Sequence, residues 1–196
     1  MTYNPEILLL NGPPRCGKDS LALFLQEHQG FTAMKFAEPL RKVVPALFSL
    51  DPEDWERMIE EHKSTPFSCL QGMTPREAQI WVSEDVVKPK FGNNFFGISM
   101  LRRIDRLRPD RIAISDSGFL EEAKVLVGYY GCSKMTLAHI YRPDCTFEGD
   151  SRSYIDLSPE GVHMWQIAND SGLPELYDAG MDMLEATDLS RARYVV

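Results

Sequence analysis

The sequence predicts an α/β fold with a mainly parallel, five-stranded sheet, and two observations support this prediction. Short apolar segments alternate along the 196-residue chain with longer helix-like segments, an order typical of parallel strands joined by helical connections. The first apolar segment leads into a glycine-containing loop, "NGPPRCGKDS", and then into a helical pattern. A strand, a glycine-rich loop and a helix in this order indicate a site for phosphate groups.

The five expected strands are short and bounded by turn-forming or polar residues. Residues 6–11 form the clearest of them, because they are apolar and are followed by Gly-Pro-Pro. Residues 111–115 alternate in polarity and end at Asp116, which would place a carboxylate at the carboxyl end of that strand. The remaining strands are expected at 32–36, 135–141 and 162–168.

The expected helices are indicated by apolar spacing and by residues typical of helix ends. In the first, 19–29, leucines and a phenylalanine supply the apolar positions and Gly30 is a stop signal. Thr74-Pro75-Arg76-Glu77 has the order of an N-cap, a first-turn proline and a capping-box acid. That helix should end at about Val87, before Lys88-Pro89. The other helices are expected at 39–48, interrupted by Pro45, from 51 onward, at 95–107, at 120–130 and from 173 onward.

Composition is that of an ordinary globular domain, with 43% hydrophobic and 26% charged residues. No apolar run approaches the roughly 20 residues that span a bilayer, and no signal peptide is expected. Four cysteines without metal-ligand spacing disfavour a zinc site and a disulfide framework, which favours a reducing, cytoplasmic location. A net charge of −8 disfavours nucleic-acid binding but leaves a small anionic substrate open.

The glycine-containing loop matches the phosphate-binding pattern G-x-x-x-x-G-K-[ST] except at its last position, where Asp19 stands. Ser20 supplies a hydroxyl one residue later and can take the role of magnesium ligand. Asp19 then becomes an extra carboxylate that could cap the helix, hold a water on Mg²⁺ or contact nucleotide. The residues expected to contact the nucleotide are Gly12, Cys16, Gly17, Lys18, Asp19 and Ser20.

Six segments follow one another in an order that one protein family shares. They read "GPPRCGKDS", "KFAEPLRKV", "TPREAQIWVSEDVVKPKFGNNFFG", "IAISDSGFLEEA", "IYRPDCTFEGDSRSYI" and "IANDSGLPEL". Together they resemble the bacteriophage-type deoxynucleoside monophosphate kinases, adenylate-kinase-like proteins with a P-loop, over nearly the whole chain. The resemblance implies one P-loop kinase domain, 1–196, of three layers, with a helical acceptor-binding region at about 38–109 and a short lid at about 142–160. The location would be the host cytoplasm if the chain is phage-encoded.

Several residues in these segments are candidates for phosphoryl transfer. Arg15 lies inside the loop, where a guanidinium can stabilise the transferring group or hold the acceptor phosphate. Arg142 and Arg152 flank the polar segment that resembles a lid, and lid arginines can close over the reacting phosphates. Asp116 can hold Mg²⁺ as a Walker B aspartate does, or serve as an N-cap of the next helix.

The acceptor-binding residues expected from the resemblance lie in the helical region. Arg76 occupies the first turn of a helix, where a cation opposes the helix dipole, so helix stability does not explain its position. The resemblance implies that Arg76 binds the acceptor monophosphate, and a surface arginine without a role is the alternative. Glu38 is a candidate for contacting the sugar or base, or is simply an acid at a helix start. Trp81 could stack on the base or belong to the core.

Two positions depart from the family pattern. Many relatives carry D-x-R-F after the third strand, whereas this chain has Asp116-Ser117-Gly118-Phe119, with glycine in place of the arginine. Pro14 replaces a residue that is basic in some relatives.

The expected activity is transfer of the γ-phosphoryl group of ATP, with Mg²⁺, to a deoxynucleoside 5′-monophosphate. A kinase for another small phosphorylated acceptor, such as dephospho-coenzyme A or phosphomevalonate, is the alternative within the same class. A nucleotide-binding module without catalysis is the alternative from a different class. The expected partners are small nucleotides, and the resemblance makes a homodimer plausible.

Overall fold

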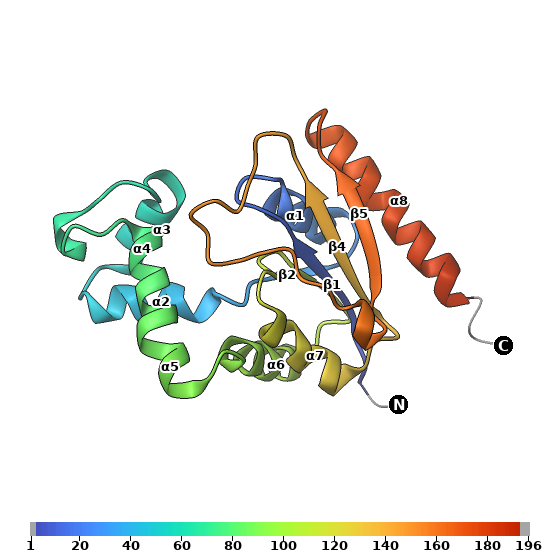
Figure 1. Ribbon diagram of the computed structural model, residues 1–196, viewed down its shortest axis with the longest axis horizontal. Coiled ribbons are helices and arrows are strands. Elements are labelled where there is room, and N and C mark those ends of the chain that lie inside the picture. Colours follow the sequence, from blue (N-terminus) through green and yellow to red (C-terminus); the bar gives the residue numbers. More distant parts are fainter. Residues whose placement is uncertain (1–2, 193–196) are drawn as a thin grey trace.

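The computed structural model describes residues 3–192 and contains a five-stranded parallel sheet (Figure 1). Its strand order is β2-β3-β1-β4-β5, and every neighbouring pair is parallel. The α/β fold expected from the sequence is therefore confirmed. The strands span Glu6–Asn11 (β1), Thr32–Met34 (β2), Arg111–Ile114 (β3), Met135–Tyr141 (β4) and His163–Ala168 (β5).

Helices cover both faces of the sheet and create two separate cores. Successive side chains of β1 alternate between them: Ile7 and Leu9 join one core, while Leu8 and Leu10 join the other. Such continuous apolar strands are typical of parallel sheets buried on both faces. The helices α1 (Lys18–His28) and α8 (Leu173–Ala192) pack on one face, and α6 (Phe95–Leu107) and α7 (Leu120–Tyr130) on the other.

A helical region stands beside the sheet, on the left in Figure 1. It begins with α2 (Glu38–Leu47), which contains Pro45, and α3 (Pro52–Glu61), whose N-cap Asp51 accepts a hydrogen bond from the backbone of Glu53. Helix α4 (Pro75–Ile80) starts with the expected capping box of Thr74 and Glu77.

The expected end of this last helix at about Val87 is wrong. The chain continues as a π-helix, η2 (Trp81–Val87), and then as α5 (Lys88–Phe91). Because the π-helix changes the helical repeat, Lys88 and Pro89 begin a new helical turn. Proline is tolerated there, since the first turn of a helix has no internal partner for its backbone N–H.

The segment between β4 and β5 runs back along the carboxyl ends of the strands and is fastened to β1. The Asn11 side chain, 1% exposed, donates to the Ser153 carbonyl and accepts from the Ile155 N–H, both at 2.9 Å. Short 3₁₀ turns occur at Ser68–Leu70 (η1) and Ser158–Glu160 (η3). None of the helices within residues 3–192 combines the length and apolar character needed to cross a membrane.

Candidate active site

An open cleft of about 1020 Å³ lies at the carboxyl ends of the strands, bordered by the helical region and by the segment after β4. Its position follows from the strand order. The chain leaves β1 toward β2 on one side and leaves β3 toward β4 on the other, so the direction of winding reverses between β1 and β3. Such a reversal opens a crevice in which α/β proteins bind ligands.

The glycine-containing loop between β1 and α1 is closely packed and depends on both of its glycines. A Cβ on Gly12 would lie 2.5 Å from the Ile140 carbonyl oxygen. Gly17 has a φ of +107°, and a Cβ there would lie 2.6 Å from a Leu176 methyl group and 2.7 Å from the Asn169 amide nitrogen. These contacts hold the loop against β4 and the segment after β5, which presents the start of α1 to the cleft.

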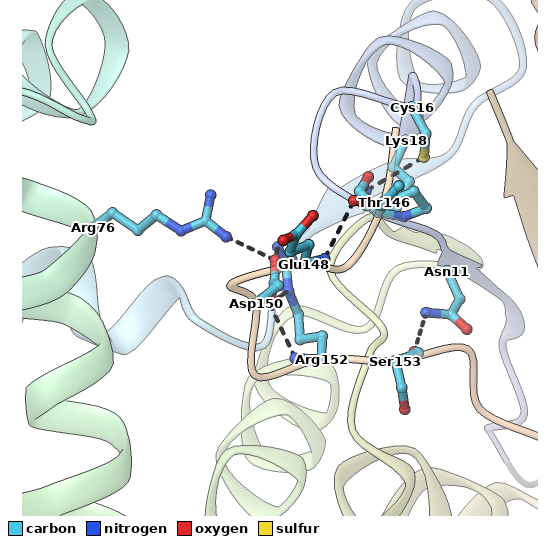
Figure 2. Close-up of polar contacts among 10 residues, drawn as sticks. Asn11, Cys16, Lys18, Arg76, Thr146, Glu148, Asp150, Arg152 and Ser153 are labelled. Carbon is cyan, nitrogen blue, oxygen red and sulfur yellow. Dashed lines mark hydrogen bonds and ion pairs between the residues drawn. The ribbon is translucent and has the colours of Figure 1, made fainter. Parts of the chain in front are cut away.

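The ammonium group of Lys18 lies against this loop. It donates to the Pro13 carbonyl oxygen at 2.5 Å and to the Cys16 sulfur at 3.5 Å (Figure 2). Burial lowers the pKa of Lys18 and raises the pKa of the Cys16 thiol, although the Lys18 charge opposes the shift at Cys16. Cys16 is fully buried, so its thiol serves the packing of the loop.

Asp19 points into the cleft and is 68% exposed. Its Oδ1 accepts a hydrogen bond from the Ser115 hydroxyl at 2.7 Å and pairs with the Lys35 ammonium at 2.8 Å. Partial desolvation acts to raise the pKa of Asp19, but Lys35 and Ser115 outweigh it and the pKa is lowered. Ser20 follows in the first turn of α1 and is not among the residues that line the cleft.

Asp116 has a different environment from Asp19. Its two carboxylate oxygens accept the backbone N–H groups of Phe36 at 2.8 Å and Ala37 at 3.0 Å. Burial raises the pKa of Asp116 against these hydrogen bonds. The same bonds divert the backbone after Met34, so β2 ends two residues earlier than expected. Asp116 lines the cleft, but its observed contacts join the end of β3 to the start of α2.

Two arginines expected in separate roles share one carboxylate. Figure 2 shows Arg76 reaching from α4 toward Asp150, on the segment after β4. Asp150 Oδ2 pairs with Arg76 Nη2 at 2.8 Å and with Arg152 Nη2 at 2.6 Å, while its Oδ1 accepts from Arg152 Nε at 3.0 Å. Although burial opposes the shift, the Arg152 hydrogen bonds and charge, aided by Arg76, lower the pKa of Asp150 to about 2.

Gly118 explains how Arg152 reaches this position. A Cβ at residue 118 would lie 2.5 Å from the Arg152 Cβ and within 2.8 Å of its Cγ and Cδ. The aliphatic stem of Arg152 therefore occupies the space that a side chain at position 118 would need. The glycine that departs from the family pattern makes room for an arginine from another segment.

The other candidate arginines meet at the glycine-containing loop. Arg15 lines the cleft and has a φ of +65°. Arg142 is exposed and lies outside the cleft lining, but its Nη1 donates to the Arg15 carbonyl oxygen at 3.1 Å. Arg142, at the start of the segment after β4, and Arg152, near its middle, thus contact different walls of the cleft.

Glu38 and Trp81 are not brought into the cleft. Glu38 is the first residue of α2, and its neighbours Ala37 and Leu40 line the cleft instead. The Trp81 ring lies 6.3 Å from the Phe48 ring and is 38% exposed. Within residues 3–192, neither residue belongs to the lining of the cleft, so their contact with an acceptor stays a prediction.

The structure adds two lysines that the sequence patterns did not single out. Lys35 follows β2 and lines the cleft beside Asp19, and its place after a parallel strand was a signal available in the sequence. Lys63 lines the cleft from the turn after α3. Desolvation and the nearby charges of Lys35 and Arg76 lower the pKa of Lys63. No local pattern marks Lys63, because only the fold carries it to the other cations.

Within residues 3–192 there is no group of three or more His, Cys, Asp or Glu side chains able to hold a metal ion. Mg²⁺ does not need such a group beside phosphates, since one or two protein oxygens and the substrate supply its ligands. The accessible carboxylate of Asp19 fits this requirement, and the neighbouring Ser20, expected as a magnesium ligand, lies in the first turn of α1 outside the cleft lining.

No protein-family model matches the chain. In an alignment 182 residues long, which covers 86% of this chain and 90% of the relative, it is 28% identical to a protein of Acanthamoeba polyphaga mimivirus named "Putative deoxynucleotide monophosphate kinase". Among solved structures it is similar to dephospho-CoA kinase from Campylobacter jejuni, with a TM-score of 0.45 and 12% identity over 92% of this chain and 96% of that one.

Proposed function

We propose that this protein is a P-loop kinase that transfers the γ-phosphoryl group of ATP to a deoxynucleoside 5′-monophosphate, giving the diphosphate and ADP. The observation that carries the proposal is the convergence of cations in one cleft. Five cationic side chains from separate segments line the cleft beside Lys18, namely Arg15, Lys35, Lys63, Arg76 and Arg152. The lining carries about as many acidic as basic side chains, so the cleft as a whole has no excess of positive charge. The cations are nevertheless grouped, because Lys63 lies near enough to Lys35, Arg76 and Arg152 for their charges to help desolvation lower its pKa. Such a group of cations suits an anionic ligand.

The loop that ends in Lys18 is the proposed site for the phosphates of ATP. It precedes an 11-residue helix, α1, whose free N–H groups and dipole favour an anion. Within residues 3–192, the hydrogen-bond partners of the Lys18 ammonium are a carbonyl oxygen and a thiol, and phosphate oxygens would be stronger acceptors. Asp19 and Ser20 would hold Mg²⁺, which supplies neutralisation of the phosphate charge when bound.

Arg76 and Arg152 are the proposed ligands of the acceptor phosphate and of the transferring group. Their shared partner, Asp150, fixes both guanidinium groups at the cleft. Phosphoryl transfer depends mainly on positioning and on neutralisation of charge. An acceptor phosphate is itself an anionic nucleophile, so the site needs no general base, and none of the pocket-lining residues is a histidine. The similarity to the mimivirus protein supports a deoxynucleotide as acceptor.

Turnover can be tested by following ADP formation with MgATP and a panel of acceptors. The panel contains deoxynucleoside and nucleoside monophosphates, dephospho-coenzyme A and phosphomevalonate. We expect turnover with deoxynucleoside monophosphates that falls by about 100-fold or more in Lys18→Ala, because a phosphate-stabilising charge is lost. Lys90→Ala is the matched control, since Lys90 is exposed and outside the cleft lining. ATP binding without turnover of any acceptor would contradict the proposal.

The acceptor assignment has its own test in Arg76→Ala. We expect a raised KM for the monophosphate and an unchanged KM for ATP. Arg57→Ala is the control, because Arg57 pairs with Asp54 on the exposed face of α3. An acceptor KM that is the same in Arg76→Ala and the wild type would show that Arg76 does not bind the acceptor.

A further inference from the structure

One part of the cleft has no role in the chemistry proposed above. It is lined from the end of α4, the π-helix, α6 and the start of α7 by Ile80, Ser83, Glu84, Phe96, Phe119 and Glu122. Two aromatic rings and an isoleucine supply apolar surface, and two carboxyl groups and a hydroxyl supply polar groups. This mixture suits a planar heterocycle with hydrogen-bonding groups on its edge.

Glu122 is the unusual member of this set, because its side chain is only 3% exposed. Its Oε1 lies 3.6 Å from the ammonium nitrogen of Lys88. The same nitrogen lies 2.8 Å from Glu84 Oε1 and 3.3 Å from the centre of the Phe119 ring. Lys88 is the charged partner of Glu122, through an ion pair and a side-chain hydrogen bond. The ammonium group of Lys88 is thus shared by two carboxyl groups, and the oxygens of these carboxyl groups can accept further hydrogen bonds.

The backbone around Glu122 is built to hold this arrangement. A Cβ on Gly97 of α6 would lie 2.4 Å from the Glu122 carbonyl oxygen, so the two helices touch closely at this residue. Glu84 and Ser83 come from the π-helix, a rare element that is frequent at functional sites. Burial raises the pKa of Glu122 to about 8 in spite of Lys88.

We propose that Glu122 reads the base of the acceptor by accepting a hydrogen bond from an exocyclic amino group. The inference rests on the proposed function and narrows its substrate class. Bases with an amino group on their pairing edge, namely guanine, cytosine and adenine, satisfy the buried carboxyl oxygens. Thymine and uracil present a carbonyl oxygen where these bases present the amino group, and their ring N3–H is the donor that remains at that edge. The carboxyl oxygen that would accept from the amino group then faces another acceptor, at a cost. Lys88 is a positioning residue, because it holds Glu122 without lining the cleft.

The test compares acceptors that differ at the amino group. The pairs are dGMP with dIMP, and dCMP with dUMP. Both the Kd, by calorimetry, and kcat/KM, by ADP formation, are measured for the wild type, for Glu122→Met and for the control Glu121→Met. Glu121 is the adjacent exposed acid in the first turn of α7. KM for ATP and the melting temperature show whether each variant keeps its fold.

We expect the wild type to favour the amino-bearing member of at least one pair by about ten-fold or more. Glu122→Met should bring that ratio close to one, while Glu121→Met leaves it unchanged. A wild-type enzyme that uses both members of each pair equally would overturn the base assignment and leave the kinase proposal standing; this result does not depend on any variant being folded. Selective binding that requires Glu122, without turnover, would support the base assignment and overturn the kinase proposal.

Discussion

Asp150 pairs with two arginines of the cleft, and its replacement by asparagine measures how much these pairs contribute to the free energy of unfolding. Its side chain is 3% exposed and pairs with Arg76 and Arg152 at 2.8 and 2.6 Å. Asp150→Asn keeps the size of the side chain but removes the charge. It leaves two guanidinium groups facing each other without a counter-ion, so we expect a less stable protein whose segment after β4 is less firmly held.

The size of the effect follows from the pKa. A shift from the ordinary value of 3.8 to about 2 corresponds to about 2 kcal/mol of unfolding free energy. The side chains of Arg76 and Arg152 are 30% and 24% exposed, so solvent screening reduces the expected loss to about 1–2 kcal/mol. Because the folded-state pKa is the lower one, the contribution is complete above about pH 4 and disappears as the pH falls toward 2.

Urea unfolding of the wild type and Asp150→Asn, at pH 7 and at pH 2.5, measures both the loss and its pH dependence. The control is Asp54→Asn, because Asp54 pairs with Arg57 on the surface with both side chains more than half exposed. That control should lose less than about 0.5 kcal/mol. Equal stability of wild type and Asp150→Asn at pH 7, or a difference that is undiminished at pH 2.5, would refute the electrostatic explanation.

Three further predictions concern the walls of the cleft. Asn11→Ala should lower the free energy of unfolding in urea by about 1–3 kcal/mol, because two buried backbone groups lose their partner; an unchanged value would show that water replaces the side chain. Gly17→Ala should weaken ATP binding measured by calorimetry, since its Cβ would lie 2.7 Å from Asn169, and wild-type affinity would contradict the packing described. Gly118→Ala should lower kcat and leave the Kd for ATP unchanged, because the added methyl group displaces Arg152. An unaltered kcat would show that Arg152 does not contribute to catalysis.

Elements with strong local signals were predictable to the residue. The strand Glu6–Asn11 and the helices Phe95–Leu107 and Leu120–Tyr130 match their expected bounds. In these segments, apolar periodicity and a following turn former such as Gly131 agree. The helix after Thr74 was predicted only at its start, because a change from α- to π-helical hydrogen bonding leaves no known pattern in the sequence.

The site was predictable in its loop and less so elsewhere. A phosphate-binding loop is a continuous stretch, so Gly12, Gly17 and Lys18 can be recognised together. The partnership of Arg76 with Asp150 spans 74 residues and exists only because the segment after β4 reaches the helical region. Glu122 is one of two adjacent acids in the first turn of α7, and no sequence pattern singles it out. Its burial depends on α6 and on Lys88, which no local pattern connects to it.

The central claim is that this cleft moves a phosphoryl group from ATP to a deoxynucleoside monophosphate. Incubation with γ-labelled ATP, Mg²⁺ and a deoxynucleoside monophosphate, followed by separation of the products, tests it directly. We expect label in the deoxynucleoside diphosphate for the wild type and its loss in Lys18→Ala. Label that appears only as inorganic phosphate, or diphosphate formed equally well by Lys18→Ala, would contradict it.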